Sequence, residues 1–203
     1  MELLSNTTFQ DNDPTLGFVD YQSQGSAKNK GLTKYDTSKK GSYMGVDFAT
    51  TYPTEQTASN RGRASVRIES KKKYTHALVI ANIGHMPDNV CGTWPAFWSV
   101  SHDNYPQWGE IDMLENINEE TQSLNVLHTS PGCTVAGNQG GVARQSGNQA
   151  SYNCDDLAQS SPYGSQSQCK KDLSTRNYHS RWSLRARALA ERLCGIRYTV
   201  LAS

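Results

Sequence analysis

The stretch that decides the fold is Trp108-Gly-Glu-Ile-Asp-Met-Leu-Glu115. Its acidic and apolar residues alternate at first, which predicts a β-strand with Glu110 and Asp112 on one face and apolar side chains on the other. In a regular strand Glu115 would point to the apolar face, because its offset from Glu110 is odd. One extra residue in a β-bulge around Met113-Leu114 would return Glu115 to the acidic face. The stretch therefore predicts a bulged strand that carries three carboxylates on one face.

Three carboxylates crowded on one sheet face repel one another, so the arrangement brings no stability of its own. Two carboxyl groups about 5–5.5 Å apart are, however, the geometry of a retaining glycosidase, with one as nucleophile and one as general acid/base. A third carboxylate between them would control how protons are shared, because neighbouring carboxylates push one another's pKa values apart. The hexapeptide alone leaves a solvent-facing acidic strand as the alternative.

Two further motifs flank this strand: Trp94-Pro-Ala-Phe-Trp98 precedes it and Leu127-His-Thr-Ser130 follows it. Together with Gly109–Glu115, His85-Met-Pro and Cys91-Gly-Thr, they resemble glycoside hydrolase family 16, specifically its fungal endo-1,3(4)-β-glucanase (laminarinase-type) branch. The resemblance extends from about residue 9 to about residue 169 and is most specific in the central third. It implies an all-β fold, a concanavalin-like jelly-roll β-sandwich with the substrate lying across its concave sheet.

The resemblance also implies the chemistry. In that family the first Glu of the motif is the nucleophile, the Asp assists and the last Glu is the acid/base; here these are Glu110, Asp112 and Glu115. We therefore expect retaining endo-hydrolysis of 1,3- or mixed 1,3-1,4-β-glucan, with no cofactor and no metal site. Two alternatives stay open: transglycosylation, in which an acceptor sugar replaces water, and a non-catalytic glucan-binding lectin. The presence of all three acids favours the enzyme.

The candidate substrate-binding aromatics are three tryptophans near the acids. Trp94 and Trp98 are four residues apart and share a face if the segment is extended, whereas Phe97 has the opposite parity and is expected in the core. Indole rings stack on the apolar faces of sugars, and Trp108 adjoins the acids directly. Large aromatic residues in strands are usually core residues, so both interpretations stay open for the tryptophans.

Two polar residues complete the set of candidates for substrate binding. His128 shares parity with Leu124 and Val126, which is typical of a core histidine, whereas the family resemblance places it beside the acids. Arg67 matches a family strand residue that can face the cleft, and a solvated arginine is the alternative.

Composition supports a single all-β domain. Only 35% of the 203 residues are hydrophobic, and polar turns separate the short strand-like segments. These segments predict an antiparallel sandwich, with residues 77–82 as a buried strand and the lysine-bearing stretch between residues 22 and 41 as a polar loop. The expected strands are 18–21, 42–47, 64–70, 77–82, 94–100 and 124–129.

The five cysteines include no C-x-x-C pair, so their spacing does not indicate a zinc site. Cys133 and Cys154 bracket a polar loop, and a disulfide between them would be worth about 3 kcal/mol by chain entropy. Such cysteine usage favours an extracellular protein. No apolar run approaches the ~20 residues of a membrane span, and Lys71-Lys-Lys73 has no basic face beyond it. We expect β-glucan as the partner of a monomer, with neither nucleic acid nor membrane.

Residues 170–203 differ in character from the rest of the chain. Residues 1–169 carry 12 Lys/Arg and 17 Asp/Glu, a net charge of −5, whereas residues 170–203 carry 8 and 2, a net charge of +6. We expect a partial family-16-like catalytic domain over 1–169 and a poorly packed or disordered basic tail over 170–203 that does not add strands in the family's manner. A frameshift or an unspliced intron in the gene model would explain this break, and the start of the chain does not read as a signal peptide. A basic helix over 182–193 is the alternative. The sandwich would then be incomplete at its C-terminus, and the chain insoluble or inactive.

Overall fold

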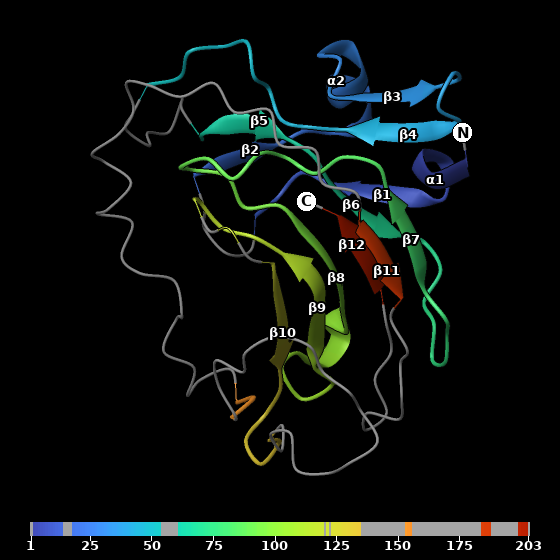
Figure 1. Cartoon of the computed structure of the whole chain (residues 1–203), viewed down its shortest axis with the longest axis vertical. Coiled ribbons are helices and arrows are strands. Elements are labelled where there is room, and N and C mark those ends of the chain that lie inside the picture. The colour runs from blue at the N-terminus through green and yellow to red at the C-terminus, as the bar shows by residue number, and fades with distance from the viewer. Residues whose placement is uncertain are drawn as a thin grey trace. The chain divides into compact units, whose positions relative to one another are not determined.

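The structure is a computed structural model that describes residues 2–13, 18–53, 61–119, 121, 123–134, 153–155, 184–187 and 199–202. In these ranges strands predominate and the helices are short (Figure 1). No helix among them is long and apolar enough to span a bilayer. The chain divides into two compact units, one of Met1–Lys73 with Thr199–Ser203 and one of Tyr74–Tyr198.

Strand pairing organises the first unit. β6 pairs antiparallel with both β1 and β12, β2 runs parallel to β5, and β3 pairs antiparallel with β4. Its elements are α1 (Glu2–Ser5), β1 (Thr7–Gln10), β2 (Val19–Tyr21), α2 (Gln24–Asn29), β3 (Thr33–Asp36), β4 (Gly41–Met44), β5 (Arg63–Ser65), β6 (Arg67–Ser70) and β12 (Thr199–Ala202).

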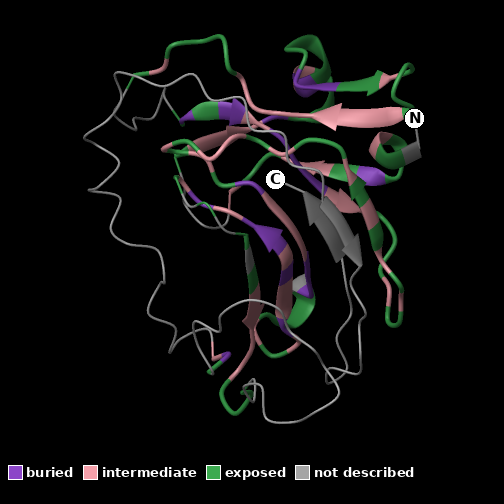
Figure 2. Ribbon diagram, viewed as in Figure 1, coloured by how far each residue is buried: buried purple, intermediate pink, exposed green. Residues whose placement is uncertain are grey.

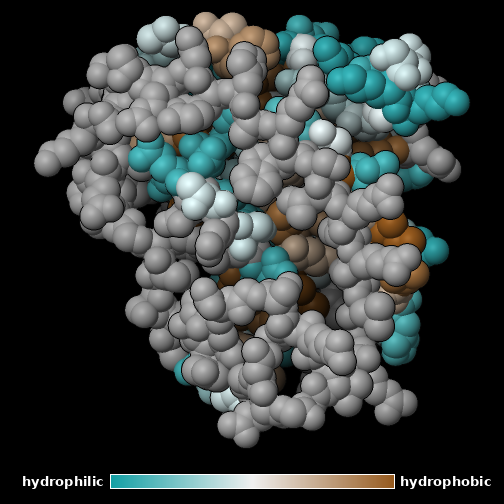
Figure 3. Space-filling model, in the orientation of Figure 1, coloured by the Kyte–Doolittle hydropathy of each residue, from teal (hydrophilic) through white to brown (hydrophobic). Residues whose placement is uncertain are grey.

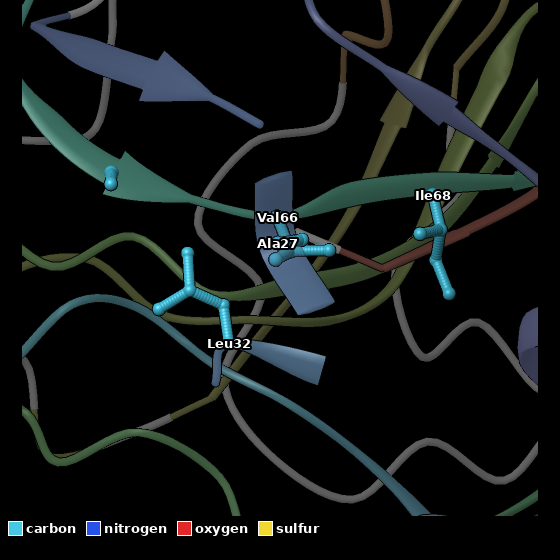
Figure 4. Packing of buried hydrophobic residues seen from close by; sticks show 5 residues of the cluster. Ala27, Leu32, Val66 and Ile68 are labelled. Atoms are coloured by element: carbon cyan, nitrogen blue, oxygen red, sulfur yellow. The ribbon is translucent and has the colours of Figure 1, made fainter. Parts of the chain in front are cut away.

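The core of this unit follows from the alternating sequence of β5 and β6. Ala64, Val66 and Ile68 are buried, as the alternation predicts, although Val66 separates the segment into two strands. Ala27 of α2 and Leu32 pack with them into one hydrophobic cluster (Figure 4). The predicted inward face of residues 64–70 is therefore confirmed.

The prediction of a polar loop between residues 22 and 41 is wrong, because this stretch contains α2 and β3. The Ser23 hydroxyl caps α2 by accepting from the Ser26 N–H at 3.4 Å, and Ala27 is the buried residue of the helix. A six-residue helix with one buried position has no apolar periodicity to detect. Hydrophilic side chains gather over this part of the unit, at the upper right of the space-filling view (Figure 3).

Asp47 organises the turn that follows β4. One carboxylate oxygen, Oδ1, accepts from the N–H groups of Ala49 and Thr50 at 2.8 and 3.0 Å, and Oδ2 accepts from the Tyr52 hydroxyl at 2.8 Å. Hydrogen bonds from the Thr50 side chain, the Ala49 N–H and Tyr52 hold the pKa of Asp47 well below its usual range.

A depressed pKa in the folded state stabilises the protein above the unfolded carboxyl pKa, and this stability is lost as the pH falls through the folded value. Asp47→Ala should therefore lower the midpoint of thermal unfolding most at neutral pH. The difference in unfolding midpoint between the variant and the wild type should shrink when the pH falls below 3.8, the ordinary pKa of an Asp side chain. Circular dichroism melts between pH 7 and pH 3 measure it. Asp47→Asn, which does not titrate, is the control. If the difference in unfolding midpoint between Asp47→Ala and the wild type stays constant with pH, the role of the Asp47 charge is contradicted.

Gly62 precedes β5 with a φ of 123°, and a Cβ there would overlap the backbone of Phe18 and Val19. Gly62→Ala should lower the free energy of unfolding by about 3 kcal/mol or more. Gly31→Ala is the control, because Gly31 has a φ of 70° but nothing within 4 Å of its Cβ position. It should cost about 1–2 kcal/mol of unfolding free energy from backbone strain alone. If both variants lose the same free energy of unfolding in urea, the backbone around Gly62 must have moved to relieve the overlap.

The second unit contains the strand with the three acids. That strand, β9, pairs antiparallel with β8 on one side and β10 on the other, and β7 pairs antiparallel with β11. Its elements are β7 (Ile80–Ile83), β8 (Ala96–Val100), η1 (His102–Asn104), β9 (Glu110–Glu115), β10 (Leu124–His128) and β11 (Leu184–Arg187).

The prediction that residues 77–82 form a buried strand is wrong in two respects. The strand begins at Ile80, and the side chains of Leu78 and Ile80 are 67% and 73% exposed. Hydrophobic atoms are visible at the right edge of Figure 3, where β7 lies. A continuous apolar run lacks the alternation that would orient its faces, so its sequence cannot distinguish a buried strand from an exposed one.

Residues 170–203 nevertheless contain two paired strands. Within the second unit, Leu184–Arg187 pairs with β7, and within the first unit, Thr199–Ala202 pairs with β6. A strand edge offers unpaired N–H and C=O groups that any extended segment can satisfy, whatever its side chains. The pairing of Leu184–Arg187 with β7 excludes a helix at these four residues, which lie within the alternative helix over 182–193. The remaining residues of the tail lie outside the described part of the chain.

The backbones of Cys133 and Cys154 lie side by side. The Cys154 N–H donates to the Cys133 carbonyl at 3.1 Å, and Thr134 forms a bridge with Asn153. No disulfide joins these two described cysteines in the structure. The disulfide therefore stays a prediction, which the pairing of the two backbones supports.

Candidate active site

The register of β9 with β8 contains one extra residue. Trp98 pairs with Asp112, but the preceding Phe97 pairs with Leu114, so Met113 is passed over. The partners of Glu110, Asp112 and Glu115 are residues 100, 98 and 96 of β8, which are evenly spaced and therefore share a face. The three acids accordingly lie on one face of β9.

The other neighbour gives the same result. On β10, Val126 pairs with Asp112 and Leu124 pairs with Glu115, so two residues of β9 lie opposite Asn125 alone. Two residues opposite one define a β-bulge, here at Met113-Leu114. The predicted bulge is thus confirmed from both sides.

Asn125 stabilises this bulge, and the sequence analysis does not identify it. Its side-chain amide donates to the Met113 carbonyl at 3.1 Å, while the Ser123 hydroxyl donates to the Glu115 carbonyl at 3.3 Å. Such bonds satisfy backbone groups that the extra residue removes from the regular ladder. An Asn within an expected strand is disfavoured, and that is the signal that could have revealed it.

Burial distinguishes the three acids. Asp112 is 3% exposed and Glu115 is also buried, whereas Glu110 is half-buried. Leu114 and Glu115 are buried, and Figure 2 shows the end of β9 in the colour of buried residues. Buried carboxylates need hydrogen-bond or charge partners, so the residues around Asp112 and Glu115 determine what these groups can do.

Trp94 supplies such a partner to Glu115. Its indole Nε1–H donates to Oε1 of Glu115 at 2.6 Å. The backbone on either side of Trp94 is fixed, because Thr93 and Pro95 accept hydrogen bonds from Asn118 and Asn116 at 2.8 and 3.2 Å. Trp94 is nevertheless 54% exposed, so it is accessible to a ligand.

His128 lies beside the acids. It pairs with Glu110 across the sheet, and its Nε2 is 3.2 Å from Oδ2 of Asp112. Its side chain is 24% exposed, so the interpretation of His128 as a core histidine is wrong. The sequence left both interpretations open, and the register places Val126 and His128 opposite the acids.

The parity expected for Trp98 and Phe97 agrees with the register. Trp98 pairs with Asp112 on the acidic face, and Phe97 pairs with Leu114 on the other face. Trp108 is half-buried just before β9, where its backbone N–H donates to the Asn104 carbonyl at 2.9 Å. Sugar stacking on these tryptophans stays a prediction.

Arg67 belongs to β6 in the first unit. It is buried, and its guanidinium lies 3.8 Å from the Glu69 carboxylate. The alternative of a solvated arginine is therefore wrong, because the charge is buried and balanced by an acid. Its predicted contact with substrate stays a prediction.

The hydrogen bond from Trp94 to Glu115 provides a test of the site. Trp94→Phe keeps an aromatic ring but removes the donor, and a hydrogen bond to a charged group contributes about 1.5–3 kcal/mol. For the glucan cleavage expected from the sequence, kcat should fall by about 10-fold or more, because each 1.4 kcal/mol corresponds to a factor of ten. Steady-state kinetics measure this, and Phe48→Leu, at an exposed aromatic residue of the first unit, is the control. An unchanged kcat would show that the bond does not orient Glu115.

The chain matches the family model of the XgeA-like catalytic domain of glycoside hydrolase family 16 over residues 7–185. It is 44% identical over 155 residues to the endo-1,3(4)-β-glucanase xgeA of Emericella nidulans, which covers 75% of this chain and 23% of that protein. It is 49% identical over 129 residues to a protein of Aspergillus clavatus named a probable endo-1,3(4)-β-glucanase, covering 64% and 19%. The chain thus spans about a fifth of the length of these relatives.

Solved structures give the same likeness. An elongating family 16 β-1,3-glucosyltransferase is 41% identical with a TM-score of 0.66, covering 75% of this chain and 48% of that one. Laminarinase 16A from Phanerochaete chrysosporium, solved with β-glucans in donor and acceptor sites, is 34% identical with a TM-score of 0.64, covering 76% and 49%. The all-β jelly-roll fold predicted from the sequence is confirmed by these likenesses.

Proposed function

Because the chain belongs to glycoside hydrolase family 16, as an XgeA-like catalytic domain, we propose that it cleaves 1,3- or mixed 1,3-1,4-β-glucan internally with retention of configuration. The observation that carries this proposal is the bulge in β9, which places Glu110, Asp112 and Glu115 on one face. The names of its relatives and the β-glucans bound to Laminarinase 16A support the choice of substrate.

In the proposed mechanism Glu110 attacks the anomeric carbon while Glu115 protonates the leaving oxygen. The bond to the leaving sugar breaks as the ester to Glu110 forms. Glu115, now ionised, then takes a proton from water, and the resulting attack on the anomeric carbon releases Glu110. The Trp94 indole would hold Glu115 in position through both steps, because it donates to Oε1.

Asp112 would act as a positioning residue between the two glutamates. It lies opposite Trp98 on one neighbouring strand, and its Oδ2 is 3.2 Å from Nε2 of His128 on the other.

Transglycosylation is the second candidate, and the 41% identity to an elongating β-1,3-glucosyltransferase favours it. Both reactions share the first half, and they differ only in whether water or a sugar hydroxyl attacks the ester. A non-catalytic glucan-binding lectin is the third candidate, although a lectin has no use for three acids on one face.

The test is incubation of the full chain with laminarin, barley mixed-linkage glucan and, as a control, cellulose, followed by mass spectrometry of the products. Hydrolysis predicts short oligosaccharides from the first two polymers, and transglycosylation predicts products longer than an added laminari-oligosaccharide acceptor. Glu115→Gln is the inactive control. Binding of laminarin without any product would support the lectin and contradict the enzyme.

A further inference from the structure

Glu110, Asp112 and His128 form a cluster whose chemistry extends beyond sugar cleavage. Each offers one ligand atom, and these atoms all lie within 4.8 Å of one another. The three residues come from adjacent strands, with His128 of β10 opposite Glu110 of β9. The sheet pairing thus holds the cluster together, and it does not depend on a loop.

The contact between His128 and Asp112 lacks hydrogen-bond geometry. Nε2 lies 3.2 Å from Oδ2, yet Oδ2 accepts no hydrogen bond within the described part of the chain. Asp112 is 3% exposed, so this oxygen is buried beside an imidazole nitrogen without being satisfied by it. A buried acceptor in this state costs about 1–3 kcal/mol, which a bound cation would offset.

The distance itself fits a metal ion. Ligand atoms 2.0–2.1 Å from a tetrahedral Zn²⁺ ion lie about 3.3–3.4 Å from one another. The 3.2 Å between Nε2 and Oδ2 is close to this value. Rotation of the long Glu110 side chain would bring its carboxylate within the same range, because its ligand atom lies within 4.8 Å of the other two.

The kind of ligand selects the ion. One imidazole and two carboxylates suit a borderline transition metal such as Zn²⁺. Ca²⁺ requires six to eight oxygen ligands, and Mg²⁺ loses its water reluctantly. Three protein ligands leave one position of a tetrahedral ion open.

We propose that Glu110, Asp112 and His128 bind one Zn²⁺ ion, and that this ion blocks glucan cleavage. The Glu110 lone pair that binds the metal is no longer available to attack an anomeric carbon. Zinc and glucan therefore exclude each other. The inhibition rests on the proposed function, whereas zinc binding itself does not.

Calorimetric titration of ZnCl₂ into the metal-free full chain tests the binding. The expected result is one ion per chain, with no comparable binding of Ca²⁺ or Mg²⁺. Co²⁺ in place of Zn²⁺ should give the intense visible absorption of a tetrahedral site. Absence of saturable Zn²⁺ binding by the wild type would overturn the proposal, as would Ca²⁺ binding of equal affinity.

Variants assign the ligands. His128→Ala should weaken zinc binding by about 100-fold or more, while His76→Ala, at an exposed histidine outside the cluster, should leave it unchanged. Circular dichroism checks that each variant folds, and His128→Gln replaces His128→Ala if the latter does not. Equal zinc affinity in His128→Ala and the wild type would place the ion elsewhere.

A further variant separates this proposal from the proposed function. Glu115→Gln should abolish glucan cleavage but keep the zinc affinity, because Glu115 is not in the cluster. In the wild type, zinc should raise the apparent KM for laminarin and a chelator should restore activity. Zinc bound at His128 without inhibition would refute the blocking role and question Glu110 as nucleophile.

Discussion

Glu110→Ala is expected to lower glucan cleavage by on the order of 10⁵-fold, a loss comparable to that of other covalent nucleophiles. Glu110 is the half-buried acid at the start of β9, opposite His128, and alanine leaves no group to form the glycosyl ester. Reducing-sugar release from laminarin measures the loss. Glu119→Ala is the matched control, because Glu119 is an exposed glutamate four residues beyond β9.

Azide gives this variant a second readout. A small anion can occupy the space vacated by the Glu110 carboxylate and attack the sugar, so activity on an activated aryl glucoside should return with inverted product. Unchanged hydrolysis in Glu110→Ala would end its assignment as nucleophile. Inactivity without rescue, in a variant that melts like the wild type, would indicate a role other than nucleophile.

Glu115→Ala is expected to lower laminarin hydrolysis by about 10²–10⁴-fold, the usual contribution of general acid–base catalysis. The bulge places Glu115 on the face of Glu110, where Trp94 donates to it. The effect should depend on the leaving group. An aryl glucoside with an acidic phenol needs no protonation to leave, so its first step should stay fast and the ester should accumulate.

The measurement is a pre-steady-state burst of phenol release with the aryl substrate and its absence with laminarin. Glu119→Ala again serves as the control. Equal losses on both substrates would contradict the acid/base role and indicate that Glu115 acts through structure alone. Full activity on laminarin would exclude Glu115 from the mechanism.

The sequence predicted most about β9 because strand parity is a strict rule. An odd offset between Glu110 and Glu115 required a bulge if the acids were to meet, and the register contains it at Met113-Leu114. The same rule placed Trp98 and Phe97 on opposite faces, as the register has them.

Strand parity groups residues by face but does not reveal which face carries the acids and which is packed in the core. The sequence pattern grouped His128 with Val126 and therefore with a core, whereas both lie opposite acids. The run 77–82 carried no alternation, and its strand is exposed at Ile80. Hydrophobicity alone could not decide these positions, because burial depends on what packs against a face.

Short and backbone-driven features were also missed. The six residues of α2 give too few turns for a periodic signal, and its Ser23 cap is a weak marker in isolation. Leu184–Arg187 pairs through backbone groups that its basic composition does not announce. The hydrogen bond of Asn125 to the bulge requires the register to be known first.

Trapping of the glycosyl ester tests the central claim most directly. A 2-deoxy-2-fluoro β-glucoside with a good leaving group slows both steps but keeps the first faster, because fluorine destabilises the oxocarbenium-like transition state. After incubation, digestion and mass spectrometry should find the fluorosugar on Glu110, one label per chain. A label on Glu115 or another residue, or an unlabelled chain that still cleaves laminarin, would contradict the assignment of Glu110 as the nucleophile of a retaining glucanase.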